Sequence, residues 1–408
     1  MTSPNTLILF TSSFPFGKGE QFLESELPIL SKRFKKVVLV PFWPDGPQRA
    51  TPENCVIEPL AERFELRGRF RTLLLKYAGT LLSSIYTLLV KSPQRLFYLK
   101  NFRKTITDLT ITLAEGDMYF KILEAHLNTS SVLYFYWFDK PFLHFAFLKK
   151  RGIINHSLVS RGLGYDYDPI RNETGFFMYR EIELQQLDKL VLNSEWGKRL
   201  MSNLYPSFRS KFERAYLGLL DHTFINPINE SGIFQLVSCS YVIDTKRVEL
   251  IVDILHHINF PLHWTHLGEG PMLEEIKLKA QSLPANISTH FPGYVDSVME
   301  YYKSTPVDLF LTTTYTEGLP FTFMESISFG IPVMGTQVCG IPEVANTQTG
   351  FLFPQTFDPK EVADQITVYK NWTPNNKLAL RDSARNFFEK TFVSEKNTNE
   401  FIDNFLLS

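Results

Sequence analysis

The sequence predicts an α/β protein with two doubly wound domains, each built around a parallel sheet. Short apolar runs alternate with amphipathic segments in the first half of the chain, and the same alternation restarts near residue 234. Such alternation is typical of parallel strands joined by crossover helices. A chain of 408 residues is too long for one typical core and suits two domains of about 200 residues each. We expect domains at 1–222 and 223–385, followed by a C-terminal helix at 386–408.

The first half opens with a strand, a glycine-containing loop, a helix and a second strand. The predicted ranges are 6–10 for the strand, 11–19 for the loop, 20–33 for the helix and 37–40 for the second strand. Further apolar runs predict strands at 131–136, 157–160 and 189–193. Gly17 and Gly19 in the first loop would let the backbone approach a ligand closely.

The second half repeats the pattern after a linker that includes 217–231. The expected elements are strands at 234–239, 263–267, 287–291 and 307–313 and helices at 246–257 and 272–283. Residues 376–408 also have a helical pattern.

Composition favours a soluble enzyme of a reducing compartment. The chain is 44% hydrophobic and 21% charged, which is ordinary for a globular protein. Three widely separated cysteines give neither a disulfide framework nor a zinc spacing. The first strand begins too early for a signal peptide, so we expect a cytoplasmic protein. Residues 1–222 carry a net charge of +8 and residues 223–408 a net charge of −9, which suggests that the halves meet different partners.

The most informative segment follows the strand at 307–311. Pro320 suits the first position of a short helix that ends at Gly330. The N–H groups of that first turn would then point into a loop at the carboxyl end of the strand, where open α/β sheets bind anions such as phosphate. Glu317 and Glu325 bracket the turn, well placed to accept hydrogen bonds from the hydroxyls of a sugar and of a ribose.

Together with Gly330-Ile331-Pro332-Val333 and Gly340-Ile341-Pro342-Glu343-Val344, this Glu-x7-Glu pattern resembles family 4 of the glycosyltransferases. The resemblance implies a retaining, nucleotide-sugar-dependent enzyme with the GT-B fold, that is, two facing Rossmann-like domains with a C-terminal helix that crosses back. It implies that Glu317 and the segment Gly318, Leu319 and Pro320 contact the donor sugar and phosphate. It also implies that Glu325 binds the ribose.

The resemblance assigns further residues to the donor. Lys246 would stabilise the leaving diphosphate, whereas the arginine that usually precedes it near Ser240 is missing, so that Arg247 or Lys18 would have to compensate. Gly268 would shape the wall around the base, and Gly293 and Tyr294 would hold the base. Gly17 and Gly19 would approach the diphosphate or the acceptor.

The segment Arg161–Asp166 resembles the family pattern Arg-x-His-Gly-x-Asp, with Leu163 at the histidine position. Leu163 can neither move a proton nor donate a hydrogen bond. Arg161 and Asp166, which match the family pattern, remain candidate active-site groups, with a structural role as the alternative. Asp166 and Asp168 also spell the metal clamp of another glycosyltransferase fold, but the domain pattern disfavours it. We expect no metal and no cofactor besides the donor substrate.

The resemblance, together with the basic N-terminal half, implies a retaining hexosyltransferase (EC 2.4) that moves a sugar from a nucleotide-diphosphate donor to a glycan or lipid-linked glycan in bacterial polysaccharide synthesis. No nucleic-acid partner is expected. One alternative is a non-catalytic donor-binding subunit, which Leu163 and the missing arginine favour. The other is a nucleotide-sugar epimerase of the same fold, which would need no acceptor surface.

Residues 61–104 combine ten basic residues with a Leu- and Tyr-rich run at 72–90. The run is interrupted by Lys76, Gly79, Ser83 and Ser84, so a membrane-spanning helix is not expected. Two interpretations stay open. The stretch forms packed helices that complete the acceptor domain, or it docks peripherally on anionic lipid at the inner face of the plasma membrane.

Overall fold

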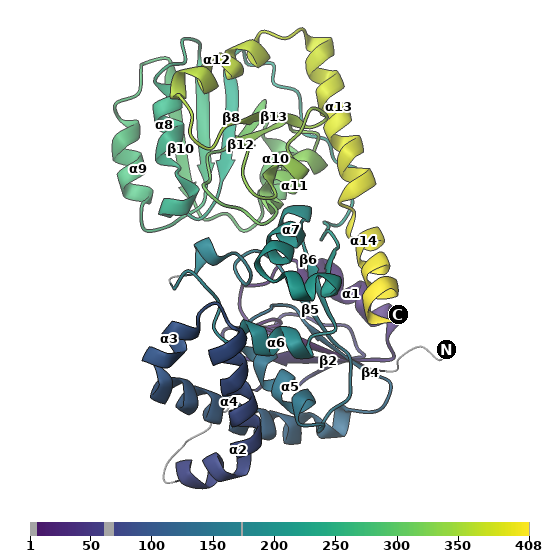
Figure 1. The fold of residues 1–408 in the computed structure, drawn as a ribbon. Coiled ribbons are helices and arrows are strands. Elements are labelled where there is room, and N and C mark those ends of the chain that lie inside the picture. The colour runs from purple at the N-terminus through teal and green to yellow at the C-terminus, as the bar shows by residue number, and fades with distance from the viewer. Residues whose placement is uncertain (1–5, 61–68, 173, 408) are drawn as a thin grey trace. The chain divides into compact units, whose positions relative to one another are not determined.

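The computed structural model describes residues 6–60, 69–172 and 174–407, which form two compact units (Figure 1). The first unit comprises residues 1–193, 197–215 and 395–408, and the second comprises 194–196 and 216–394. The chain therefore passes to the second unit after Ala215 and returns to the first at Glu395, whereas the sequence suggested 222 and 386.

The first unit is built on a seven-stranded sheet in the order β3-β2-β1-β4-β5-β6-β7, in which every neighbouring pair is parallel. Its strands are β1 Thr6–Thr11, β2 Lys36–Pro41, β3 Cys55–Ile57, β4 Ser131–Phe135, β5 Leu158–Gly162, β6 Lys189–Leu192 and β7 Phe212–Arg214. Strands β1, β4 and β5 are buried along their whole length. Burial on both faces explains why they appear in the sequence as continuous apolar runs without alternation.

The first unit also contains α-helices and short 3₁₀- or π-helical segments, which are labelled η. They are α1 Leu23–Arg33, α2 Phe70–Tyr86, η1 Thr87–Lys91, α3 Arg95–Lys100, α4 Phe102–Leu123, η2 Glu124–His126, α5 Lys140–Lys150, η3 Pro169–Arg171, α6 Arg180–Gln186, α7 Glu195–Leu204 and η4 Pro206–Lys211. Helices α2 and α3 come from the stretch at 61–104 for which packed helices were one interpretation, and α4 begins at its end. Leu81, Leu88, Leu109, Leu113 and Phe147 are among the residues of the core cluster that joins them to α5.

The second unit has a six-stranded sheet in the order β10-β9-β8-β11-β12-β13, again with parallel pairing throughout. Its strands are β8 Phe234–Cys239, β9 Leu262–Leu267, β10 Ile287–Gly293, β11 Leu309–Thr312, β12 Val333–Thr336 and β13 Gly350–Phe353. Its helices are η5 Asp244–Lys246, α8 Glu249–Leu255, α9 Leu273–Ala280, α10 Val298–Ser304, α11 Phe321–Ser328, η6 Ile341–Glu343, α12 Pro359–Lys370 and α13 Pro374–Thr391. The predicted α/β class with two parallel sheets is confirmed.

Two helix starts differ from the prediction. The helix expected from Lys246 is a short turn at Asp244–Lys246, after which Arg247 adopts a left-handed conformation (φ 49°) and α8 begins at Glu249. Pro320 is extended (φ −76°, ψ 103°) and caps α11 from outside, so the helix begins one residue later, at Phe321.

The last segment packs into the core of the first unit. It consists of α14 Ser394–Phe401 and η7 Ile402–Leu406. The Phe401 ring lies 5.1 Å from that of Tyr134 on β4, and Ile402 and Leu406 join the same core cluster. The expected return of the C-terminal helix to the first domain is therefore observed.

Candidate functional site

The second sheet changes direction between β8 and β11. These two strands are adjacent, but the chain leaves β8 towards β9 on one side and reaches β11 and β12 on the other. Loops 240–248 and 313–320 follow the carboxyl ends of these strands. Ligands of open α/β sheets bind outside the strand ends at such a switch point.

Hydrogen bonds join the two loops to each other. Tyr315 N donates to Thr245 O at 2.8 Å, Thr314 Oγ1 donates to the same carbonyl at 3.0 Å, and Thr313 Oγ1 donates to Arg247 O at 2.7 Å. This register brings Lys246 Nζ against Glu317 Oε2 in an ion pair. Their side chains are 25% and 18% exposed, so the pair is partly accessible to a ligand.

The guanidinium of Arg247 binds backbone carbonyls of neighbouring loops, so its charge is directed to the protein. Its Nε donates to Thr313 O at 2.8 Å and its Nη1 to Gln355 O at 3.1 Å. Burial lowers the pKa of the guanidinium. We therefore assign Arg247 to positioning the loop that carries Lys246, and its direct contact with a donor stays a prediction. The other proposed substitute, Lys18, is exposed in the first unit after β1.

Glu325 lies on the second turn of α11, near the partly buried thiol of Cys239. Burial raises the pKa of Glu325 to about 7, and its negative charge adds to burial in raising the pKa of Cys239 to about 12. In the described part of the chain the Glu325 carboxylate accepts no hydrogen bond, and its residue is only partly buried. A carboxylate in this state is suited to accept bonds from ligand hydroxyls.

Glycines allow the surrounding loops to touch. A Cβ on Gly268 would lie 2.0 Å from Ser240 O, and a Cβ on Gly340 would lie 1.9 Å from Gly318 O. Any side chain at these positions would separate the loops after β8 and β11 from their neighbours. Gly293 ends β10 with its carbonyl bound to Gly268 N at 2.9 Å, and Tyr294 beside it is 44% exposed.

The arrangement suits an anionic ligand that carries hydroxyl groups. Lys246 supplies a cation, and the N-terminus of α11, preceded by Gly318, Leu319 and Pro320, supplies amides and the positive end of the helix dipole. The carboxylates of Glu317 and Glu325 can accept hydrogen bonds from the hydroxyl groups of the ligand. Within the described residues no group of three or more His, Cys, Asp or Glu side chains is placed to hold a metal ion.

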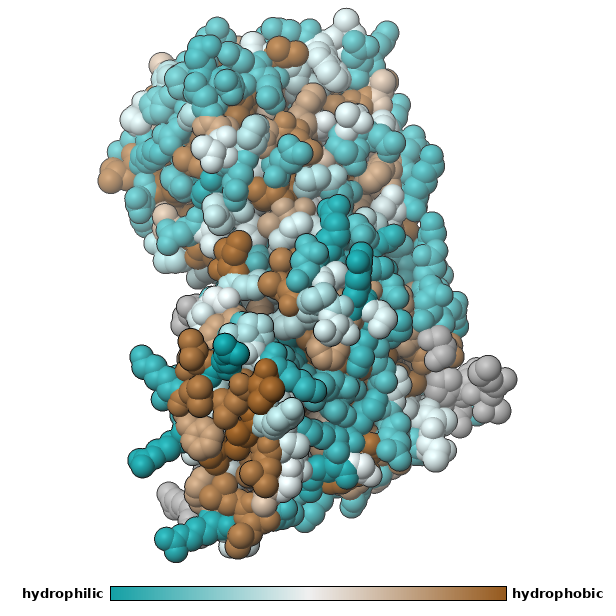
Figure 2. Space-filling model, in the orientation of Figure 1, coloured by the Kyte–Doolittle hydropathy of each residue, from teal (hydrophilic) through white to brown (hydrophobic). Residues whose placement is uncertain are grey.

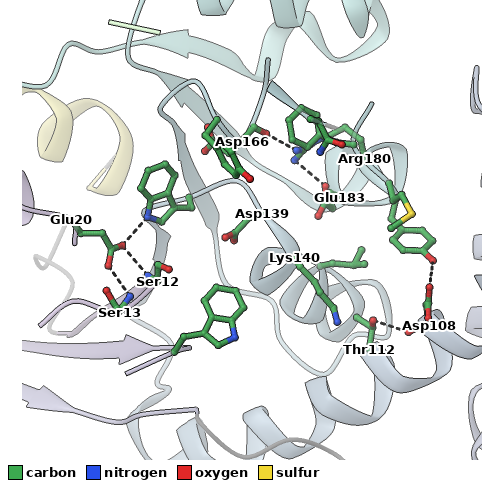
Figure 3. Close-up of a pocket in the computed structure, with 18 of the residues that line it drawn as sticks. Ser12, Ser13, Glu20, Asp108, Thr112, Asp139, Lys140, Asp166, Arg180 and Glu183 are labelled. Carbon is green, nitrogen blue, oxygen red and sulfur yellow. Dashed lines mark hydrogen bonds and ion pairs between the residues drawn. The ribbon is translucent and has the colours of Figure 1, made fainter. Parts of the chain in front are cut away.

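The first unit contains a cavity of about 760 Å³ at its own switch point, where β1 and β4 are neighbours (Figure 3). Aromatic walls and carboxylates line it. The aromatic residues are Trp43, Trp137, Tyr165, Phe177 and Tyr179, and the carboxylates are Glu20, Asp108, Asp139, Asp166 and Glu183. Gly19 lines the cavity, whereas Gly17 closes against the chain itself, since a Cβ there would lie 2.6 Å from Asp45 O. The contact of either glycine with a donor or acceptor stays a prediction.

Glu20 organises the loop on one side of this cavity. Its carboxylate accepts hydrogen bonds from Ser12 N at 2.8 Å, Ser13 N at 2.8 Å and Phe14 N at 2.7 Å. It also accepts a bond from Trp137 Nε1 at 2.7 Å. These four bonds fix both the loop after β1 and the indole of the cavity wall (Figure 3).

Asp139 lies centrally, between the Glu20 loop and the ion pair of Arg180 with Glu183 (Figure 3). Asp139 occupies the N-cap position of α5, but its side chain makes no hydrogen bond to the described residues. Burial, reinforced by the charges of Asp166 and Glu183, raises the pKa of Asp139 well above its usual range. Burial likewise raises the pKa of Glu183 to about 7.

The two first-unit residues predicted to be catalytic have different positions. Asp166 borders the cavity, but its carboxylate accepts bonds from Phe138 N at 2.9 Å, Leu163 N at 2.8 Å and Gly164 N at 3.1 Å, so it also shapes the loop. Burial raises its pKa.

Arg161 does not line the cavity. It is fully buried on β5, donates to Tyr134 Oη at 2.6 Å and to Glu26 Oε1 at 3.3 Å, and stacks 3.9 Å from the Phe401 ring. Its active-site assignment is therefore replaced by a structural one, because its charge is neutralised inside the core.

Sequence reasoning missed most of the cavity. Trp137, Asp139 and Lys140 follow the predicted strand at 131–136, so their place at the carboxyl end of a parallel strand was a usable signal. Arg180 and Glu183 on α6 gave no such signal, because only the tertiary fold brings that helix to the cavity.

Comparison with known proteins accords with this geometry in the second unit. Residues 226–386 match the family model of glycosyl transferases group 1. The match contains Lys246, Glu317 and Glu325 and excludes the cavity of the first unit. The putative colanic acid biosynthesis glycosyltransferase WcaL of Escherichia coli K12 is 22% identical over 228 residues, which are 52% of this chain and 55% of that protein. The chain thus spans about half the length of this relative.

Solved structures extend the likeness to the whole fold. The lipopolysaccharide outer core galactosyltransferase WaaB superimposes with a TM-score of 0.64 at 12% identity, covering 98% of this chain and 99% of that one. Anabaena HepE in complex with UDP and glucose gives a TM-score of 0.61 at 12% identity, covering 98% of each chain. The fold is therefore that of the GT-B glycosyltransferases.

Proposed function

We propose that the protein is a retaining glycosyltransferase that moves a hexose from a nucleotide-diphosphate sugar to a glycan in polysaccharide synthesis. The proposal depends on the ion pair of Lys246 with Glu317, which lies just before the N-terminus of α11. The group 1 match over this unit supports it, as does the role in colanic acid synthesis named for the relative WcaL.

The diphosphate would bind at Lys246 and the first turn of α11, with Glu317 holding the ammonium in place until the donor arrives. As the bond between the anomeric carbon and the diphosphate oxygen breaks, negative charge grows on that oxygen. A fixed cation and oriented amides stabilise such a charge more than water does, because they need no reorganisation. Glu317 would then be free to contact the donor sugar, and Glu325 to accept the ribose hydroxyls.

Retention follows if the acceptor hydroxyl attacks the face that the diphosphate leaves. The new bond joins the acceptor oxygen to the anomeric carbon, and the hydroxyl proton passes to the departing phosphate oxygen. No side chain has to take that proton, so Leu163 at the position of the family histidine is compatible with transfer. The positive charge comes from protein groups, and the proposal includes no metal.

The cavity of the first unit is the proposed acceptor site. Aromatic faces beside carboxylates recognise sugars, because the rings cover the apolar faces of a pyranose and the carboxylates accept its hydroxyls. Trp43, Trp137 and Tyr165 supply the rings, and Asp139 supplies a carboxyl group with no partner in the described chain. We further propose that the protein acts in the cytoplasm, in line with its three free thiols.

The test is a panel of UDP-, GDP- and TDP-sugars, screened by thermal stabilisation and by release of the nucleoside diphosphate. One donor should stabilise the protein and be turned over. Lys246→Ala should lower turnover by roughly 10²-fold. The matched control is Lys277→Ala, which breaks the exposed pair of Lys277 with Glu274 on α9 and should leave turnover unchanged. A Lys246→Ala variant with parental turnover would refute the site, and binding without turnover by the parent would indicate the non-catalytic alternative.

A further inference from the structure

Helix α2 carries apolar residues on two opposite sides, but only one side is packed. Leu73, Tyr77 and Leu81 recur every four residues and belong to the core of the first unit. The opposite stripe, which continues through η1, is exposed to solvent. Its members are Leu75 (81% exposed), Leu82 (69%), Tyr86 (59%) and Val90 (55%). A helix that is apolar on both sides normally has a partner on each.

The exposed stripe continues onto the next helix. Leu96 (74% exposed) and Leu99 (54%) lie on α3, and Phe102 (40%) is the first residue of α4, so the three recur every three residues. Figure 2 shows hydrophobic residues gathered over α2 and α3 with hydrophilic side chains projecting at the edge. We name these seven residues on α2, η1, α3 and the start of α4 the apolar face.

The segment of the chain that carries the apolar face also carries many basic residues and no acidic residue. Residues 69–107 contain eight basic residues and no Asp or Glu, and all eight are exposed. Lys76 is neutralised by Asp117 of α4. The other seven form no ion pair in the described part of the chain, and they are Arg69, Arg71, Lys91, Arg95, Lys100, Arg103 and Lys104. Two further basic residues of the predicted stretch, Arg63 and Arg67, lie outside the described residues.

We propose that the apolar face docks the first unit flat on an anionic lipid bilayer. The exposed leucines would enter the interface while the surrounding cations pair with lipid phosphates. Two copies of this chain would not cover the face for each other, since each would bring seven unneutralised cations to the contact. A bilayer supplies both an apolar interior and the negative charge that the basic residues require.

Docking in the plane of the membrane fits the structure better than crossing. The segment Phe70–Lys91 is long and apolar enough to span a bilayer. Its other side, however, is committed to the protein, because Tyr77 Oη donates to Asp117 Oδ2 at 2.8 Å and Leu81 and Leu88 lie in the core. Spanning would expose that core and break these contacts.

The same helices border the cavity of the first unit. Tyr179, which lines the cavity, donates its backbone N–H to Tyr98 Oη of α3 at 2.9 Å. Phe97 of α3 contacts Phe176, with ring centroids 5.1 Å apart. Asp108 and Thr112 of α4 line the cavity directly. Resting on the proposed function, the inference therefore extends to the acceptor, which would be a glycan carried by a membrane lipid.

Co-sedimentation with vesicles tests the docking without any nucleotide or acceptor. The protein should bind mixed phosphatidylcholine–phosphatidylglycerol vesicles at low salt, bind phosphatidylcholine vesicles at least tenfold more weakly, and leave the anionic vesicles at high salt. The double variant Leu82→Glu/Leu96→Glu should lose at least tenfold in partition. The matched control Leu278→Glu/Val368→Glu alters similarly exposed residues of the second unit (67% and 62% exposed) and should bind like the parent.

Equal partition of the parent and the face variant would overturn the proposal, as would salt-insensitive binding to neutral vesicles. A parent that is dimeric in solution and a face variant that is monomeric would overturn it in favour of a second copy. A circular dichroism spectrum and a thermal unfolding curve that match those of the parent confirm that the face variant is folded.

A second measurement separates docking from transfer. With one oligosaccharide offered either free or on a lipid carrier in anionic vesicles, the face variant should lose at least tenfold in kcat/KM for the lipid-borne acceptor and nothing for the free one. Equal losses would refute the lipid-borne acceptor. Absence of transfer to both acceptors by the parent would instead refute the proposed function, while vesicle binding would still stand.

Discussion

Replacing Glu325 with glutamine should abolish a pH dependence of nucleotide-sugar binding. Burial raises the pKa of Glu325 from 4.5 to about 7 in the unliganded protein. A ribose that donates to this carboxylate binds its ionised form, so affinity should rise with pH and level off above pH 7. If the bound carboxylate stays ionised throughout, affinity should fall about 50-fold between pH 7 and pH 5.

The same residue should make the unliganded protein less stable as pH rises. Because the pKa is higher in the folded than in the unfolded state, the folded state holds the proton more tightly. The stability is therefore present below pH 4.5 and is lost as the pH rises through 7. At 1.36 kcal/mol per pH unit the loss amounts to roughly 3 kcal/mol. Glu325→Gln should be more stable than the parent by up to this amount at pH 8 and equally stable near pH 4.

Calorimetric titration with an intact nucleotide sugar, together with denaturant unfolding across this pH range, measures both effects. Intact nucleotide sugar is preferable to free diphosphate, because its phosphates do not titrate in this range. Glu275→Gln is the matched control, since it removes the same charge from an exposed position of α9. A parent with a flat binding profile, or a Glu325→Gln variant that keeps the parental slope, would refute the reasoning.

Three further predictions test other parts of the structure. Transfer should survive EDTA, because Lys246 and backbone amides supply the positive charge; complete loss that Mn²⁺ restores would favour a metal clamp at Asp166. Arg161→Met should destabilise the first unit by about 3–5 kcal/mol in denaturant unfolding, since it leaves Glu26 buried without a cation; a loss below about 1 kcal/mol would contradict the structural role. Asp139→Asn should raise the acceptor KM at least tenfold with donor hydrolysis unchanged, and an unaltered KM in steady-state kinetics would remove Asp139 from the acceptor site.

The fold class and the donor motif could be predicted from the sequence because both depend on residues that are close together in the chain. A parallel strand buried on both faces is a continuous apolar run, as in β1 and β11, and the alternation of such runs with helices fixes the sheet type. Glu317, Pro320 and Glu325 lie within nine residues of one another, so their relation to one helix start follows from spacing alone. Pro320 was misplaced by one position, because a proline at either position satisfies the same local rules.

What only the tertiary structure decided depends on partners that are distant in sequence. Arg161 and Glu26 are 135 positions apart, and no local pattern shows that the guanidinium turns into the core and away from the cavity. Lys246 and Glu317 meet across 71 positions only because hydrogen bonds join the loops of two neighbouring strands. The apolar face on α2 likewise needed the structure, because a sequence shows that a helix is apolar on two sides but only packing reveals which side is left uncovered.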